Sequence, residues 1–230
     1  MRKNFYVKKY EEIAGFKVWI VDGNYIRKNI DIEFTNFGHH YRFSFIPKDE
    51  FWIDKEYSHN EKKYYITNML VTYYLMSHGK SHKEAVARAD AIERKERSKS
   101  KLIQSKIKKI PKKKLVQKVH KRLLIKYSKK IKVWIVNGEL VRDLLFLDFT
   151  EGGHDKVYPF IPSNEVWLDD DSTAKERKFI LLHEIHERNL MDKGWDYEKA
   201  HRSASEIEYF CRHNPKILEK NLTNEFKKIK

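Results

Sequence analysis

Cysteine is nearly absent from this chain, and so are long apolar runs. Cys211 alone cannot form an internal disulfide bond, which favours a reducing compartment. No apolar run approaches the roughly 18 residues that a membrane-spanning helix needs. The N-terminal residues 1–4 lack the apolar core of a signal peptide. We therefore expect a soluble, intracellular protein that does not contact a membrane.

Acidic residues are almost missing from one segment. Residues 94–130 contain 17 lysines and arginines against a single acid, Glu96, whereas the whole chain has a net charge of +15. The basic charge therefore belongs to one Lys-rich connector, which we place at residues 96–130, and the remainder is close to neutral. Leu115, Val119 and Leu123 follow four-residue spacing there, which favours a basic amphipathic helix over part of it.

The connector has two interpretations of equal weight. It could bind nucleic-acid phosphates, an anionic surface or an acidic partner. It could also be a solvated spacer, since Tyr127 is its one aromatic residue suited to base stacking. Its densest part could also be a localisation signal. The candidate nucleic-acid residues are Lys108, Lys109, Lys112, Lys113 and Lys114.

The sequence repeats itself at an offset of 115 residues without a gap. Residues 17–21 and 132–136 are both Lys-Val-Trp-Ile-Val, and residues 17–93 share 26 identities over 77 positions with their counterparts. A period this long excludes a solenoid and predicts two homologous domains. We expect a first repeat over 1–95, a second over 131–213, and a basic C-terminal tail over 214–230.

Each repeat is expected to be an α+β domain in which a small antiparallel β meander precedes two antiparallel helices. In the second repeat, strands are expected at 133–136, 144–149, 157–161 and 166–168. Asn137-Gly138 is expected to be a hairpin turn, and 151–153 the next turn. Capping boxes at Thr173 and Ser58 should begin the first helices. Gly194 and Gly79 should end them, and second helices should start near Asp196 and Ser81.

The segment His183-Glu184-Ile185-His186-Glu187 places ionisable groups within an apolar helical run. Imidazoles and carboxylates on a packing face must be hydrogen-bonded, ion-paired or bound to a metal. His183 and Glu187 lie one turn apart and could chelate one ion, and His201 of the next helix could supply a third ligand. Zinc is the expected metal, with Glu184 as general base. Further candidates are His186, His154 and Glu208.

The first repeat serves as an internal comparison for these residues. Asn68, Met69, Thr72 and Val86 occupy the positions of His183, Glu184, Glu187 and His201, while the helical framework is retained. This pattern predicts one working centre in the second repeat and a structural role for the first. His154 and Glu208 have counterparts in His39 and Glu93, which points to structural roles for them. A buried histidine–glutamate hydrogen-bond network is the alternative to a metal site.

The helix partly resembles that of the zincin metallopeptidases, whose pattern has histidines at i and i+4. Here Glu187 is at i+4 and His186 at i+3, which weakens a peptidase assignment. The segments 133–138, 148–154, 162–167 and 182–184 resemble a family of small uncharacterised proteins from phages, large DNA viruses and bacteria. This resemblance covers nearly all of the second repeat and, more faintly, the first, and it implies a viral type of protein, located in the host cytoplasm or the virion.

The sequence thus leads to two functional hypotheses. The first is a metal-binding, zinc-dependent hydrolase with its centre in the second repeat. The second is a non-enzymatic, viral-type protein that binds nucleic acid, or has a structural role, through the basic connector.

Overall fold

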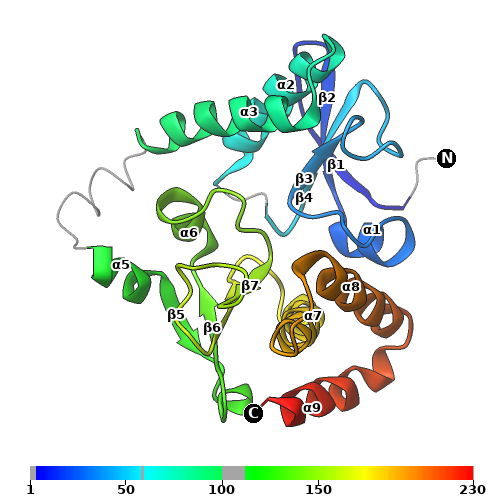
Figure 1. Ribbon diagram of the computed structural model, residues 1–230. Helices are drawn as coiled ribbons and strands as arrows, with labels where there is room; N and C mark the ends of the chain where they lie inside the picture. Colours follow the sequence, from blue (N-terminus) through cyan, green and yellow to red (C-terminus); the bar gives the residue numbers. More distant parts are fainter. Residues whose placement is uncertain (1–3, 58–59, 100–111, 230) are drawn as a thin grey trace. The chain divides into compact units, whose positions relative to one another are not determined.

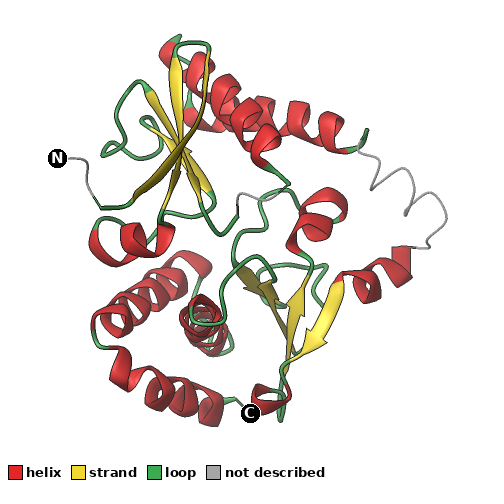
Figure 2. Ribbon diagram, turned by 180° about the vertical axis from the view of Figure 1, so that it is seen from behind, coloured by secondary structure: helices red, strands yellow, loops and turns green. Residues whose placement is uncertain are grey.

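The computed structural model describes residues 4–57, 60–99 and 112–229 (Figure 1). They form two compact units, and each unit carries one repeat. Each unit contains a four-stranded mixed sheet with helices, so the α+β class is confirmed (Figure 2). Within the described ranges, no helix is long and apolar enough to cross a membrane.

The sheet of the first unit has a parallel pair of strands at its centre. Its strand order is β1-β2-β4-β3, and both outer strands are antiparallel to their neighbours. Helix α1 follows β2, and helices α2 and α3 follow β4. The bounds are β1 Tyr6–Ile13, β2 Phe16–Val21, α1 Gly23–Asn29, β3 Phe37–His39, β4 Glu50–Asp54, α2 Lys62–Ser77 and α3 His82–Arg97.

Successive side chains of the central strands pack into separate cores on the two faces of this sheet. Val18 and Ile20 of β2 pack in one cluster with Met69 of α2, whereas Trp19 packs in another with Ile26 of α1. Because successive side chains of a strand point to opposite faces, a run of consecutive apolar residues is what a strand covered on both faces requires.

The second unit repeats this arrangement with strand order β5-β6-β8-β7. Each residue pair between its two central strands is numbered 115 higher than the corresponding pair of the first unit. For example, Val18 lies opposite Phe51 in the first unit, and Val133 lies opposite Val166 in the second. The predicted repeat is therefore confirmed at the level of topology. The bounds are α5 Lys112–Val119, β5 His120–Leu123, η1 Ile125–Tyr127, β6 Lys132–Val136, α6 Gly138–Leu144, β7 Gly152–His154, β8 Glu165–Asp169, α7 Glu176–Met191, α8 Tyr197–His213, η2 Pro215–Ile217 and α9 Leu218–Lys228.

The predicted antiparallel meander is wrong, because β6 and β8 are parallel and α6 lies between them in the chain. Asn137-Gly138 starts this helix rather than a hairpin: the Asn137 side chain accepts a hydrogen bond from the Leu140 amide at 2.8 Å. A Cβ atom on Gly138 would lie 2.0 Å from a carboxylate oxygen of Asp169. Glycine is needed here for a close approach, not for a turn.

Two further strand predictions are also wrong. Residues 144–149 contain the end of α6 and irregular chain, and residues 157–161 form turns. The predicted turn at 151–153 is wrong as well, since residues 152 and 153 belong to strand β7. Leu147, Phe149 and Ile161 are nevertheless buried. The apolar pattern of these segments therefore indicates that they are buried in the core, and not that they pair in a sheet.

Most helix boundaries agree with the sequence signals, but α7 begins at Glu176 after the N-cap residue Lys175, and not directly after Thr173. Ser81 and Glu84 form a capping box at α3, and the Asp196 side chain caps α8. Gly79 and Gly194, just beyond α2 and α7, have φ of +81° and +90°. Thr173 accepts a hydrogen bond from the Glu176 amide at 3.2 Å. The predicted box at Ser58 lies outside the described residues.

The predicted connector and tail contribute to the fold of the second unit. The end of the connector forms α5, β5 and η1, and Val119 lies in the core. The prediction of a C-terminal tail is wrong for residues 214–229. They form η2 and α9, and Leu218, Leu222 and Ile229 join the main core cluster. Lys108 and Lys109 lie outside the described residues, as do the side chains of Lys112, Lys113 and Lys114.

Candidate metal centre

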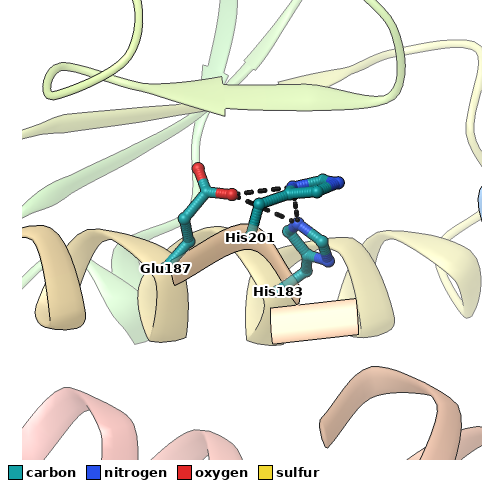
Figure 3. A group of neighbouring side chains, drawn as sticks. All are labelled: His183, Glu187 and His201. Carbon is teal, nitrogen blue, oxygen red and sulfur yellow. Dashed lines mark hydrogen bonds and ion pairs between the residues drawn. The ribbon is translucent and has the colours of Figure 1, made fainter. Parts of the chain in front are cut away.

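Three side chains from α7 and α8 meet at one point of the second unit (Figure 3). His183 and Glu187 lie one turn apart on α7, and His201 comes from α8, which packs against it. His201 Nδ1 lies 3.1 Å from His183 Nε2 and 2.8 Å from Glu187 Oε2. His183 Nε2 and Glu187 Oε2 are 3.6 Å apart. The structure thus brings together the three residues that the sequence analysis selected as ligands.

These separations are close to those of a coordination shell. Bonds of about 2.0–2.2 Å to a tetrahedral ion place ligand atoms about 3.3–3.6 Å apart. Of the observed separations of 2.8, 3.1 and 3.6 Å, the first must widen by about 0.5–0.8 Å and the second by about 0.2–0.5 Å to reach this range. Side-chain rotation alone can supply such shifts.

Glu208 determines which nitrogen of His183 faces the other two residues. His183 Nδ1 lies 2.9 Å from Glu208 Oε2, and an ionised carboxylate can only accept, so Nδ1 carries a proton. In a neutral imidazole the remaining nitrogen, Nε2, then has a free lone pair. A carboxylate behind a histidine is the usual support of a metal ligand, since it fixes the ring and makes Nε2 more basic.

His154 of β7 is fully buried and approaches Glu187 from the sheet. Its Nδ1 accepts the backbone N–H of Lys156 at 3.2 Å, so its proton is on Nε2, which donates to Glu187 Oε1 at 2.9 Å. His154, Glu184 and Glu187 also form a group of closely spaced donor atoms. However, a ring that donates through Nε2 cannot bind a metal through the same atom. His154 therefore orients the carboxylate.

The contact between His183 and His201 limits where protons can be. Two nitrogens that both carried hydrogen could not face each other at 3.1 Å, so at least one of them presents a lone pair. Both also face the Glu187 carboxylate, which presents lone pairs only. A group of lone pairs directed at one point needs a proton or a cation at that point.

The charges of the cluster reinforce one another. The hydrogen bond to Glu187 raises the pKa of His201 to about 9. Burial would lower the pKa of His183, but hydrogen bonds to Glu187 and Glu208 outweigh it and hold the pKa well above the usual range. Burial would raise the pKa of Glu187, but hydrogen bonds from the three histidines hold it far below the usual range. The site therefore favours positive charge opposite Glu187.

Glu184 has a different environment, although it neighbours His183 in the chain. Burial, and then the nearby Glu187 carboxylate, raise the pKa of Glu184 to about 8. Its side chain is partly exposed, and no hydrogen bond or ion pair holds it among the described residues. A carboxyl group with these properties can give or take a proton near neutral pH.

The other sequence candidates do not contribute to the point where the three side chains meet. His186 points away from the cluster, with its Nδ1 3.0 Å from Glu225 of α9 and its Nε2 3.0 Å from Ser203. Glu208 supports His183, as described above, and also accepts from Arg212 at 2.8 Å. The acidic run 169–171 offers three carboxylates, but Arg142 and Lys121 are ion-paired with it. Structural pairing is therefore sufficient to explain that run.

Two tyrosines at the site were not selected from the sequence. The ring of Tyr197 stacks on His201 with centroids 5.4 Å apart, and burial raises the pKa of Tyr197 to about 12. Burial and then Glu184 raise the pKa of Tyr158. Tyr197 precedes His201 by four residues, a helical spacing that could have revealed it. No local spacing connects Tyr158 to α7.

The first repeat retains the framework of the site without its histidine–glutamate core. Asn68 donates to Glu93 at 2.9 Å, in the place of His183 and Glu208, and Thr72 donates to Asn68. Arg97 pairs with Glu61 and Glu93, as Arg212 pairs with Glu176 and Glu208. The buried arginine network is therefore common to both units, and the facing lone pairs are confined to the second.

Comparison with known proteins does not assign this site to a family. No protein-family model, curated protein or solved structure matches the chain. The resemblance of the sequence to a family of small viral and bacterial proteins stays a prediction, and the function must be argued from the geometry.

Proposed function

We propose that the second repeat is a mononuclear, zinc-type metal centre of a hydrolase, with His183, Glu187 and His201 as ligands. The observation that carries this proposal is the convergence of His183 Nε2, His201 Nδ1 and Glu187 Oε2 within 3.6 Å. A hydrogen-bond network alone leaves one of these contacts between lone pairs. A divalent cation satisfies all three at once.

The donor set fits catalytic rather than purely structural zinc. Structural sites close the ion with four protein ligands, whereas three nitrogen and oxygen ligands leave a position for water or substrate. The His201 side chain is 33% exposed, so one member of the cluster reaches the solvent. When bound, the ion would supply a Lewis acid and lower the pKa of a water molecule at the open position.

Glu184 is the group of this chain that we assign to proton transfer. It lies beside the ligands with a partly exposed carboxyl group that is not committed to another residue of the described chain. From there it can accept a proton from the attacking water and return it to the leaving group. Tyr197, stacked on His201, forms one wall of the approach.

Metal content is the direct test. Purified protein loaded with zinc and desalted should contain about one ion per chain by plasma emission spectrometry, because three ligands converge once. His183→Asn combined with Glu187→Thr, which copies the first repeat, should bring the content close to zero. His186→Val copies the same repeat outside the cluster and should leave about one ion, so it is the matched control.

Catalysis is tested separately from binding. Glu184→Met also copies the first repeat and should retain the ion while abolishing hydrolysis of chromogenic ester or phosphoester substrates, since a base is not a ligand. Equal metal content in the wild type and the double variant would refute the metal site. Full activity in Glu184→Met would refute the assigned base.

A further inference from the structure

A cavity of the second unit lies between η1 and α9, away from the histidine cluster. It has a volume of about 410 Å³ and is lined by residues from the end of the basic connector and from the C-terminal helix. Figure 1 shows α9, in red, ending beside the green segment that follows β5. Two basic segments that are far apart in the sequence therefore meet at one cavity.

The lining has a strong excess of positive charge. Lys126, Lys129, Lys130 and Lys227 surround the cavity, and its acidic residue Glu219 is already shared between Lys126 at 3.0 Å and Lys178 at 2.6 Å. Lys129 and Lys227 have no ion-pair partner among the described residues. Two ammonium groups are thus available to an anion in this cavity.

The floor of the cavity is aromatic. Tyr127 and Phe226 stack with ring centroids 5.5 Å apart and an interplanar angle of 17°, and both are half-buried. Lys126 Nζ lies 5.0 Å from the centroid of the Tyr127 ring. A planar aromatic group can continue such a stack, and lysines at its rim can hold a phosphate attached to it.

We propose that this cavity binds one nucleotide unit, with its base against the Tyr127–Phe226 stack and its phosphate between Lys129 and Lys227. Pocket volumes of about 300–1,000 Å³ are typical of small-ligand sites, so the size is adequate. Both a free nucleotide and a residue of a single strand carry this chemistry. The location at the end of a segment with 17 basic residues against one acid favours the strand.

Fluorescence anisotropy with a labelled 12-residue oligothymidylate tests the proposal on the full chain, with thymidine monophosphate and inorganic phosphate as competitors. Lys129→Ala with Lys227→Ala should weaken binding at least tenfold and lower the salt-dependence slope by about 0.7, as expected for one lost single-strand phosphate contact. Tyr127→Leu should weaken binding roughly 5- to 100-fold at unchanged slope, because it removes stacking and not charge.

Lys216→Ala with Lys220→Ala is the matched control, since it removes the same charge from exposed positions of η2 and α9 outside the lining. Thermal melting confirms that each variant is folded. If thymidine monophosphate competes and inorganic phosphate does not, the cavity is a site for free nucleotides. If neither competitor displaces the oligothymidylate and the variants of the cavity residues bind it more weakly, the cavity is a site for the strand. Absent binding, equal weakening by the control pair, or an unaffected Tyr127→Leu variant would overturn the proposal.

Discussion

His154 donates to Glu187 Oε1, while Oε2 of the same carboxylate faces His183 and His201. This contact holds the carboxylate in one orientation without adding a ligand. Removing it through His154→Leu should weaken zinc binding about 10- to 100-fold, as is typical for the supporting partners of ligands. Competition with a chromogenic chelator measures the affinity, and the content at saturation should stay at about one ion.

His154→Gln is the control for this prediction, because its amide can still donate to Glu187. It should recover part of the affinity. A loss of stoichiometry instead of affinity in His154→Leu would mean that His154 is itself a ligand, contrary to the proton positions inferred above.

For individual residues, the sequence was sufficient to predict the three side chains that converge, but not the residues that surround them. His183, Glu187 and His201 follow from helical spacing and from their replacement in the first repeat. The counterpart His39 pointed to a structural role for His154, yet His39 lies beside the rings of Phe51 and Tyr73, whereas His154 donates to Glu187. A contact between a strand and a helix depends on packing, which neither helical spacing nor alternation encodes.

Among the elements, α9 contacts α7 through apolar residues and also through one buried carboxylate. Glu225 accepts from Asn189 and pairs with His186 and Lys228. Burial would raise its pKa, but the hydrogen bonds, led by that of His186, outweigh it and bring the pKa to about 2. A folded-state pKa below the unfolded value stabilises the fold above pH 4.5, and this contribution is lost as the pH falls towards 2.

Glu225→Gln should therefore reduce the free energy of unfolding by up to about 3 kcal/mol at pH 6. The difference from the wild type should vanish near pH 2, which urea unfolding at several pH values can measure. Glu206→Gln removes an exposed carboxylate of α8 and should change little at either pH. A difference for Glu225→Gln that is constant with pH would contradict the assigned ion pairs.

Helix ends were predictable from capping residues and glycines, whereas strand identity was not. Asn137-Gly138 satisfies a hairpin signal but caps α6, because Gly138 must pass close to Asp169. β5 was hidden within a Lys-rich segment, since an edge strand needs few apolar residues: His120 and Leu123 are partly buried, and Lys121 and Arg122 are exposed. Charge composition therefore concealed an element of the sheet.

For the whole molecule, the common framework predicts that the first repeat can regain a centre. His39 and Glu93 already occupy the supporting positions, and Asn68 contacts Glu93 as His183 contacts Glu208. Asn68→His, Thr72→Glu and Val86→His together should raise the zinc content from about one to about two ions per chain. Plasma emission spectrometry on the loaded, desalted protein provides the measurement.

The matched control for this graft omits Thr72→Glu and so lacks the carboxylate that both histidines face. It should remain at about one ion. If the complete graft also remains at one while its circular dichroism and melting are unchanged, convergence of the three donors is not sufficient for binding.

The arginine network also has a consequence for substitution at the site. Glu93 and Glu208 are each held by an arginine that spans two helices, irrespective of what stands at the position of His183. Substitution at the histidine positions therefore leaves these arginine contacts in place, and the fold of either repeat does not require the chemistry of the site.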